Sequence, residues 1–521
     1  KLNILLLTQS KPMNYLKFAL LCMVLVGVNT SHAKNISERQ IDRIVENAMK
    51  VFSVPGMGIG VIIDGKVRHA KGYGVRSLSR NDKVDTKTYF GIASNSKGFT
   101  ATALGLLVED GIIKWDDKVK DHLPDFQLSD PWITDHFTIA DLLSHHSGLP
   151  LGSGDLMWWP DSNYQPDEII KKMRFLKPDR EFRTTYAYNN LPFIVAGAII
   201  PAVTGKSYHQ FLQDRIFDHL NMTHCTANTP MMAANDNIAE PHAVLDGKLK
   251  QVKRYLTIEQ VPGSIAAAGI QCSVDDLLKW EMMHLNHGKG LMSKAAHDQL
   301  WQVNTAMNVT DNHIQNGITY RGYGLGFTLN DYHGQQIISH GGALIGMYSH
   351  LTMVPELGFA IAIISNQQSS SANNHIKNQI LDQIMNVSGR ATAKQIYKAG
   401  EKRQKQEVSR LKKLKSSIFT IISPDNYIGI YTDPFWDDVT ISKNTNGLYF
   451  TSSRSPSLKG SLEHYKNNTY IVRWDDRTHE ADAYVMFEND ATGKVKSFTM
   501  KAISIRTDFS YDFHHLNMIK Q

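Results

Sequence analysis

Two serines and a lysine stand close together in the stretch FGIASNSKGFT, residues 90–100. A serine hydroxyl is a weak nucleophile until a neighbouring base takes its proton. On a helix, residues three apart share a face, so Ser94 and Lys97 can meet, whereas Ser96 and Lys97 cannot. A helix that begins at Ser94 would also direct backbone N–H groups toward the serine, where they can stabilise an oxyanion. The spacing predicts an activated serine nucleophile, with a helix-capping role for Ser94 as the alternative.

Two further segments carry side chains that can take part in such chemistry. Tyr188, Asn189 and Asn190 precede a strongly apolar helical pattern. A phenol near a lysine can relay a proton to a leaving group, and an Asn amide can hold a substrate amide or the lysine. Residues 340–342, His-Gly-Gly, close a β-like run, and paired glycines would let a substrate backbone lie against the strand edge. Taken singly, each segment also fits a structural role as a loop or turn.

The elements that would position these residues follow from the hydrophobic pattern. Residues 35–51 have helical spacing with a capping-box sequence at the start. Residues 58–63 and 66–70 flank Asp64-Gly65, the strongest short hairpin signal in the chain. After a helix-rich middle, β-like runs return at 323–329, 336–339, 347–354 and 359–365. This order predicts an α/β, three-layer αβα fold, in which helices flank an antiparallel sheet closed by both ends of the domain, with an all-α insert.

The pattern of the chain changes near residue 392. Residues 394–415 hold nine Lys or Arg against two Glu, which predicts a solvated linker helix. Short alternating runs separated by turn residues follow at 439–441, 448–450, 470–474, 483–487 and 497–505. Their spacing predicts a small C-terminal all-β barrel or sandwich.

Length and charge limit the classes of function. At 521 residues the chain exceeds what one hydrophobic core usually organises, so at least two domains are expected. The formal net charge of +6 comes entirely from residues 394–415. The remainder of the chain is near neutral, which argues against a nucleic-acid-binding surface.

The N-terminal residues have the pattern of a targeting segment. From Met13 the chain reads MNYLKFALLCMVLVGVNTSHA, with one Lys, an apolar core of about ten residues and a small-x-small ending at Ala33. This predicts a signal peptide cleaved after Ala33, and hence a periplasmic or secreted protein with no stable membrane span in its mature chain. Cleavage leaves Cys225 and Cys272, which can pair in that compartment or stay as buried thiols.

Together and in this order, these segments resemble the serine β-lactamase and DD-peptidase (penicillin-binding-protein-like) superfamily, in its branch related to class C enzymes. The resemblance covers about residues 53–366 and includes VPGMGIGVIIDGKV, LVEDGIIKWDDKVKDHLP, LLSHHSGLP, GKSYHQFLQDRIFDHLNM and AAAGIQCSVDDLLKW. It implies a serine hydrolase of the β-lactamase, D-Ala-D-Ala carboxypeptidase or D-aminopeptidase type. No metal or organic cofactor is implied, and His145 and His146 lack a ligand pattern, so we expect them to be packing or surface residues.

The resemblance also implies which residues act. Ser94 would be the nucleophile that is acylated, and Lys97 would accept its proton, together with Tyr188. Asn190 would orient the substrate amide. The backbone N–H groups of Ser94 and Ala343 would form the oxyanion hole. The implied catalytic residues are Ser94, Lys97 and Tyr188, and the implied substrate-binding residues are Asn190, His340, Gly342 and Ala343.

One position departs from the superfamily pattern. Class C β-lactamases and many DD-peptidases place a Lys where this chain has His340. A Lys is a permanent cation, whereas His carries only a partial charge near neutrality. The variant resembles that of D-aminopeptidases and carboxylesterase-like members, which argues against efficient β-lactam hydrolysis. If His340 binds an anionic group, activity on carboxylate-bearing substrates should fall as pH rises through about 6 to 7; the alternative is a neutral ring hydrogen-bonded in place.

The C-terminal region is similar to the lipocalin-like domain appended to many β-lactamase-related hydrolases. It carries PDNYIGIYTD, then NGLYF and a run of hairpins, and a barrel filled by side chains is expected over one that binds a small apolar ligand. The expected domains are an upstream extension with signal peptide (1–33), a β-lactamase-like serine hydrolase domain (34–391), a charged linker (392–423) and a lipocalin-like barrel (424–521).

Three hypotheses for function follow. The leading one is a secreted serine hydrolase that cleaves an amide or ester through a Ser94 acyl-enzyme, on D-amino-acid peptides, peptidoglycan fragments or related β-lactam or ester substrates. The second is a weak β-lactamase or broad carboxylesterase. The third is a non-catalytic cell-wall ligand sensor or scaffold, against which the competent residues at every catalytic position argue. The substrate, a homo-oligomeric state and the role of the barrel stay open.

Overall fold

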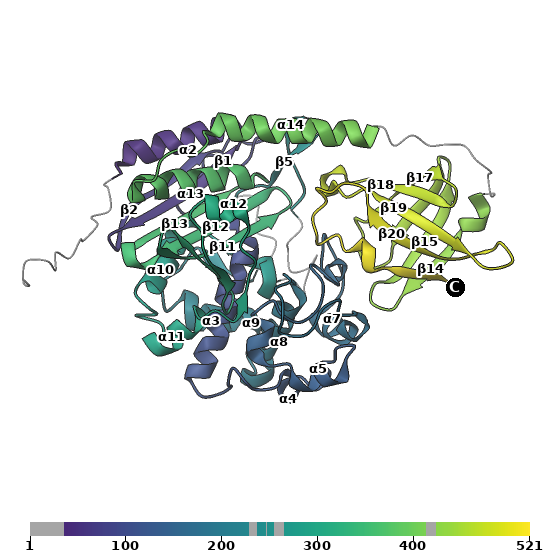
Figure 1. Cartoon of the computed structure of the whole chain (residues 1–521), viewed down its shortest axis with the longest axis horizontal. Coiled ribbons are helices and arrows are strands. Elements are labelled where there is room, and N and C mark those ends of the chain that lie inside the picture. Colours follow the sequence, from purple (N-terminus) through teal and green to yellow (C-terminus); the bar gives the residue numbers. More distant parts are fainter. Residues whose placement is uncertain (1–35, 229–236, 246, 255–264, 413–423) are drawn as a thin grey trace, which may run out of the picture.

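The structure is a computed structural model that describes residues 36–228, 237–245, 247–254, 265–412 and 424–521. The expected signal peptide and part of the expected linker lie outside the described residues. Figure 1 shows a sheet with helices on both faces, a helix-rich part below it and a barrel to one side. The predicted architecture, an antiparallel sheet flanked by helices and followed by an all-β barrel, is confirmed.

One antiparallel sheet of eight strands forms the core of the first domain, in the order β2-β1-β13-β12-β11-β10-β9-β8. These strands are β1 (Gly56–Ile63), β2 (Lys66–Gly74), β8 (Thr305–Ala306), β9 (Arg321–Tyr323), β10 (Thr328–Tyr332), β11 (Gln335–Leu344), β12 (Met347–Val354) and β13 (Phe359–Ser365). Because β1 pairs with β13, segments from the two ends of the domain lie side by side, as the sequence predicted.

Two strand boundaries differ from the prediction. The run 323–329, expected as one strand, is broken by a turn at Gly326, whose φ of 81° lies in the left-handed region that favours glycine. β11, expected at 336–339, continues to Leu344. The His-Gly-Gly segment at 340–342 therefore lies inside a strand rather than at its end.

Helices α2 (Glu38–Phe52) and α13 (Ser370–Met385) cover one face of the sheet, and α10 (Val274–Leu285) lies on the other (Figure 1). Side chains of β1 that face α2 and α13, such as Ile59, join Ile376 in one buried cluster. On the opposite face, Gly60 leaves room for α10, because a Cβ there would lie 2.7 Å from the Leu278 side chain. The alternation of large and absent side chains along β1 thus lets helices pack closely on both faces.

The predicted insert is rich in helices but is not all-α, because it also holds a three-stranded sheet and the hairpin of β5 (His242–Leu245) and β6 (Lys248–Gln251). It begins with the segment that carries the serines. A short strand, β3 (Phe90–Gly91), leads into a 3-10 turn, η1 (Ala93–Asn95), and then into the buried helix α3 (Ser96–Glu109). Other helices are α4 (Val119–His122), α5 (Pro131–His136), α6 (Ile139–Leu142), α7 (Pro166–Lys172), α8 (Leu191–Thr204), α9 (Tyr208–Leu212), α11 (Lys294–Leu300) and α12 (Asp311–Gln315). Among the described residues no single helix has the length and apolar composition of a membrane span, although α8 and residues 208–217, bent by 82°, have them together.

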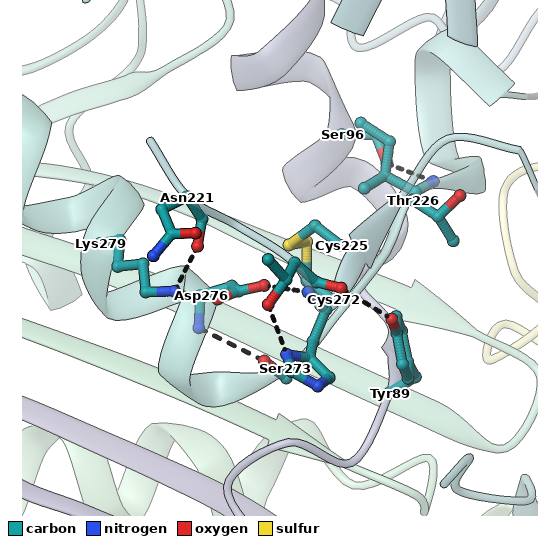
Figure 2. Close-up of a disulfide and its surroundings, with 12 residues drawn as sticks. Tyr89, Ser96, Asn221, Cys225, Thr226, Cys272, Ser273, Asp276 and Lys279 are labelled. Atoms are coloured by element: carbon teal, nitrogen blue, oxygen red, sulfur yellow. Dashed lines mark hydrogen bonds and ion pairs between the residues drawn. A yellow bond between two sulfur atoms is a disulfide. The ribbon is translucent and has the colours of Figure 1, made fainter. Parts of the chain in front are cut away.

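A disulfide joins Cys225 to Cys272, a pairing that the sequence left open. The cysteines face each other across the short antiparallel strands β4 (Cys225–Thr226) and β7 (Gln271–Cys272) (Figure 2). β7 also pairs with β3 and follows directly on Ile270, whose N–H donates to Ser96 Oγ at 3.1 Å. The disulfide therefore stabilises the small sheet behind the serine-containing segment.

Removing this disulfide should lower the free energy of unfolding by about 4 kcal/mol, because a cross-link between residues 47 apart reduces the entropy of the unfolded chain. The measurement is urea unfolding of the purified chain before and after reduction, beside the Cys225→Ala/Cys272→Ala variant. The variant with reductant added controls for other effects of the reagent. Unchanged urea midpoints in the reduced protein and in the variant would contradict the prediction.

The C-terminal region forms a closed antiparallel barrel of eight strands. These are β14 (Gly429–Asp433), β15 (Asp437–Asn444), β16 (Gly447–Ser452), β17 (Lys459–Lys466), β18 (Thr469–Trp474), β19 (Ala483–Asn489), β20 (Val495–Ala502) and β21 (Asn517–Lys520). The predicted runs fall in β15, β16, β18, β19 and β20, of which the last ends at Ala502 rather than at residue 505. Buried rings, among them Trp436, Trp474 and Phe498, fill the interior, as expected.

Helix α14 (Ala393–Lys412) packs on both domains and connects them (Figure 1). Near its start, the Tyr397 ring lies edge-on to Phe52 of α2, with centroids 6.1 Å apart. Near its end, Arg410 Nη2–H donates to Ile503 O at 2.7 Å. Ser504 Oγ–H donates to Glu407 Oε1 at 2.9 Å. The prediction of a helix in the charged segment is confirmed, and this helix contacts the barrel as well as the sheet domain.

Candidate active site

Ser94 lies in the η1 turn between β3 and α3, and Lys97 lies in the first turn of α3. Ala93, just before the serine, has a φ of 51°, which is uncommon for a residue with a side chain and marks a sharp change of chain direction. Ser94 is partly exposed, whereas Ser96 and Lys97 are fully buried. The turn thus exposes Ser94 and keeps Lys97 beneath it.

Lys97 has three oxygen neighbours. Its Nζ lies 2.7 Å from Asn190 Oδ1, 2.9 Å from Ala267 O and 3.2 Å from Ser94 Oγ. Burial lowers the pKa of Lys97 to about 7, so a large fraction of the amine is neutral at neutral pH. A neutral amine has two N–H donors, which serve Asn190 and Ala267, and one lone pair, which is left for the Ser94 hydroxyl. Ser94 is therefore beside a base that can take its proton.

Asn190 is held in turn by Asp155, a residue that no sequence motif marks. Asn190 Nδ2–H donates to Asp155 Oδ2 at 2.8 Å, and Trp158 Nε1–H donates to Asp155 Oδ1 at 2.9 Å. Burial raises the pKa of Asp155 to about 7, and its negative charge opposes the lowering of the Lys97 pKa. The available signal was a lone acidic residue in the otherwise uncharged stretch PLGSGDLMWWP. Asp155 thus positions Asn190 and adjusts the charge near Lys97.

Tyr188 lies against the same lysine and serine. Lys97 Nζ is 5.0 Å from the centroid of the Tyr188 ring. Burial raises the pKa of Tyr188 well above 10, and a hydrogen bond with Ser94 opposes that rise. Tyr188 is therefore a neutral phenol at neutral pH, able to donate a proton. The His145 ring packs on it with centroids 4.2 Å apart, and His146 is also buried, so of the two expected roles, packing or surface, both residues have the packing role.

His340 was expected to lose its proton between about pH 6 and 7, and the structure contradicts this. Burial lowers the pKa of His340 to about 3, so the ring is neutral at pH 7. Nδ1 lies 2.7 Å from Gly341 O, which can only accept, so Nδ1 carries the proton. Tyr323 O–H then donates to Nε2 at 3.0 Å. Both ring nitrogens are used inside the protein, which matches the alternative of a neutral ring hydrogen-bonded in place.

Gly342 makes room for the serine turn as well as bordering the pocket. The pairing of β11 with β10 ends at Ser339, so the last residues of β11 have no strand on that side. A Cβ at Gly342 would lie 2.3 Å from Ile92 O and 2.8 Å from the Ala93 side chain. The sequence predicted that a substrate backbone would lie against the paired glycines, but the turn around η1 occupies part of that space. Ala343, the next residue, borders the pocket.

Six of the seven expected site residues border one pocket, which we call the active-site pocket, and Lys97 lies beneath it. The pocket has a cavity volume of about 230 Å³ and is open to solvent, so it has room for a small organic group. The C-terminal barrel contributes to its lining, which the sequence did not indicate. Bordering residues include Ser94, Tyr188, Asn190, His340, Gly342 and Ala343 from the first domain, and Asp508, Phe509 and Ser510 from the barrel.

The geometry agrees with comparisons to known proteins. The Beta-lactamase family matches residues 41–384, which is more than half of the chain. A second family, described as a domain of unknown function (DUF3471), matches residues 423–520 and so covers the barrel. A similar fold occurs in an octameric penicillin-binding protein homologue from Pyrococcus abyssi, with a TM-score of 0.58, 19% sequence identity and coverage of 93% of this chain and 100% of that chain.

Two proteins are also similar to this chain in sequence. Unguisins hydrolase ungD' of Aspergillus campestris (strain IBT 28561) is 28% identical over 428 residues, which cover 77% of this chain and 76% of that protein. Protein flp of Staphylococcus aureus (strain MW2) is 27% identical over 359 residues, 67% of each chain. The chain therefore belongs to the Beta-lactamase family, within the serine β-lactamase and penicillin-binding-protein superfamily, whose members are generally serine hydrolases.

Proposed function

We propose that the protein is a secreted serine hydrolase that cleaves an amide or ester bond through an acyl-enzyme at Ser94. The environment of Lys97 carries this proposal. Its buried amine has a pKa lowered to about 7 and lies 3.2 Å from Ser94 Oγ, with acceptors placed for both of its other N–H groups. A lysine held largely neutral beside a partly exposed serine is typical of a catalytic pair.

In the proposed reaction, Lys97 takes the hydroxyl proton while Ser94 Oγ attacks the substrate carbonyl carbon. The backbone N–H groups of Ser94 and Ala343 stabilise the oxyanion. As the intermediate collapses, the Tyr188 phenol gives a proton to the leaving amine or alcohol, and the Lys97 ammonium returns a proton to Tyr188. Lys97, now neutral again, takes a proton from a water molecule while the water oxygen attacks the Ser94 ester. The Lys97 ammonium then gives that proton to Ser94 Oγ, so the acid is released and the serine hydroxyl is restored.

We propose D-amino-acid peptides, peptidoglycan fragments and related esters as the substrate class. Family membership supports this class, and one relative is named as a hydrolase of unguisins. Efficient β-lactam hydrolysis is not part of the proposal, because the neutral His340 offers no cation to the carboxylate of a β-lactam. The same uncharged position favours a broad carboxylesterase as the second candidate.

We also propose export to the periplasm or outside the cell. The N-terminal signal pattern and the disulfide between Cys225 and Cys272 support it, because disulfides persist in oxidising compartments. Assembly into a homo-oligomer stays a prediction. The octameric state in the description of the Pyrococcus abyssi structure belongs to that protein.

Intact-mass spectrometry after exposure to D-Ala-D-Ala peptides, β-lactams and p-nitrophenyl esters tests the proposed function. We expect a transient mass increase equal to the acyl group with at least one peptide or ester, and slower acylation by penicillins. Heat-denatured protein, exposed in the same way, controls for nonspecific acylation. If no member of the panel gives an adduct or a product, the non-catalytic sensor or scaffold becomes the better account.

A further inference from the structure

A segment of the C-terminal barrel forms one wall of the active-site pocket. Asp508, Phe509 and Ser510, between β20 and β21, border it. The Phe509 ring stands edge-on to the Tyr188 ring, with centroids 5.7 Å apart. A Cβ at Gly152 would lie 2.7 Å from Phe509, so the wall lies close against the first domain. The barrel therefore contributes to the surface that a substrate meets.

Hydrogen bonds hold this wall in place. Ser510 Oγ–H donates to Asp155 Oδ2 at 2.8 Å, and Gly154 N–H donates to Asp512 Oδ2 at 2.6 Å. Ser510 and Asp512 are both buried. Asp155 belongs to the network that surrounds the lysine amine, so the wall is tied to that network. Asp508, two residues before Ser510, is thereby held at a defined place in the pocket.

Asp508 gives the pocket an unbalanced negative charge. It is the only Asp, Glu, Lys or Arg among the described residues that border the pocket, and His340 is neutral. Its carboxylate accepts a hydrogen bond from Ser510 N–H at 2.9 Å, and no cation among the described residues pairs with it. Burial raises the pKa of Asp508 because desolvation disfavours its charged form, and hydrogen bonds from Ser510 oppose that rise. A cation that enters the pocket would compensate that charge.

We propose that Asp508 binds a protonated amine of the substrate, so that the pocket selects substrates with an ammonium group on the acyl side of the scissile bond. This inference rests on the proposed serine hydrolase function and names a substrate class for it. The ammonium donates hydrogen bonds to the carboxylate, and the apolar Phe509 beside it lowers the local polarity and strengthens the pair. A substrate carboxylate meets a like charge at Asp508 and no cation at His340.

Two matched pairs of p-nitroanilides test this proposal on the whole protein. Alanine and isobutyryl p-nitroanilides differ by an ammonium in place of a methyl group at the α-carbon, and alanine is used in both D and L forms. 6-Aminohexanoyl and heptanoyl p-nitroanilides differ in the same way at the far end of the acyl chain. We expect kcat/KM to be about 10- to 100-fold higher for the ammonium member of at least one pair. The responding pair distinguishes an α-amine from a distant one, and equal rates within both pairs would overturn the proposal.

Variants separate binding by Asp508 from the intrinsic reactivity of the substrates. Asp508→Asn keeps the size of the side chain and removes the charge, so the ammonium-to-methyl ratio of kcat/KM should fall about 10-fold or more. Asp508→Glu keeps the charge and should retain part of the ratio. Asp490→Asn, on an exposed turn of the same barrel, is the matched control and should keep the wild-type ratio. If folded Asp508→Asn keeps the wild-type ammonium-to-methyl ratio of kcat/KM, the proposal is wrong. If this variant does not fold, the comparison of the substrate pairs on the wild-type protein decides.

Failure of the proposed function gives a different result. If the protein cleaves none of the anilides and takes no fluorophosphonate at Ser94, it is not a serine hydrolase. The proposed function and the ammonium subsite are then both refuted. A protein that takes the label and cleaves both members of each pair equally keeps the function and loses only the subsite. If it takes the label without cleaving anilides, alanine amide should slow labelling of the wild type but not of Asp508→Asn, and equal protection would refute the subsite.

Discussion

Replacing Ser94 with Ala should abolish covalent labelling of the protein by a fluorophosphonate probe or by penicillin. Ser94 Oγ lies 3.2 Å from Lys97 Nζ and borders the active-site pocket. An adduct requires a serine oxygen that a base can deprotonate, and the variant has no other described hydroxyl paired with this lysine. Intact mass and peptide mapping measure the label, which should disappear altogether from the peptide that contains residue 94.

Ser96→Ala is the matched control, because both serines lie on the same short segment. Ser96 is fully buried, and its Oγ accepts a hydrogen bond from Ile270 N–H at 3.1 Å. Its loss should cost about 1 kcal/mol of stability, while a measurable fraction of the protein still takes the label. Labelling that survives Ser94→Ala and is lost in Ser96→Ala would reverse the assignment of the nucleophile.

Short sequence patterns correctly predicted the elements that local residues determine, namely a hairpin turn and the start of a helix. The hairpin at Asp64-Gly65 formed as expected, and Ser37 N–H donates to Gln40 Oε1 at 2.9 Å at the start of α2. The predicted ends of the strands at 323–329 and 336–339 were wrong. Where a strand ends depends on the turn and on the length of its partner, which hydrophobic alternation does not report.

The same distinction applies to the active-site pocket. Ser94, Tyr188 and Asn190 stand in motifs of a known family, and the fold places all three at one pocket, although their roles stay predictions. Asp155 and Ser510, which meet across the domain boundary, are 355 residues apart, and neither stands in a motif. Only the packing of the barrel against the first domain brings them together, and a motif search cannot recover such a contact.

His340 shows that residue type alone does not determine charge. An unperturbed His has a pKa near 6.5 and would be partly protonated at neutral pH. In the fold, burial and the nearby Lys97 lower the pKa of His340 to about 3. The expected cation is therefore absent at pH 7, and the acidic residue that borders the pocket, Asp508, lies on the other domain. Both outcomes depend on long-range packing.

Lys97→Arg should lower the rate of acylation by about 10³-fold or more. Arg keeps the positive charge, but its pKa above about 12 prevents it from accepting the Ser94 proton at neutral pH. Single-turnover kinetics with a neutral p-nitrophenyl ester measure the rate. Lys66→Arg, at the exposed start of β2, is the matched control and should acylate at the wild-type rate. Near-normal acylation by Lys97→Arg would exclude Lys97 as the general base.

The direction in which the acylation rate by the same neutral ester changes with pH tests whether Lys97 is the general base. Because the pKa of Lys97 is about 7, the amine is mostly protonated below that pH and mostly neutral above it. The rate should therefore rise with pH between about 6 and 8 and then level off, opposite to the fall expected for substrate binding by a protonated His340. Asp155→Asn removes a negative charge that raises the pKa of Lys97, so the rise should move to lower pH. A rate that falls with pH would show that another group controls acylation.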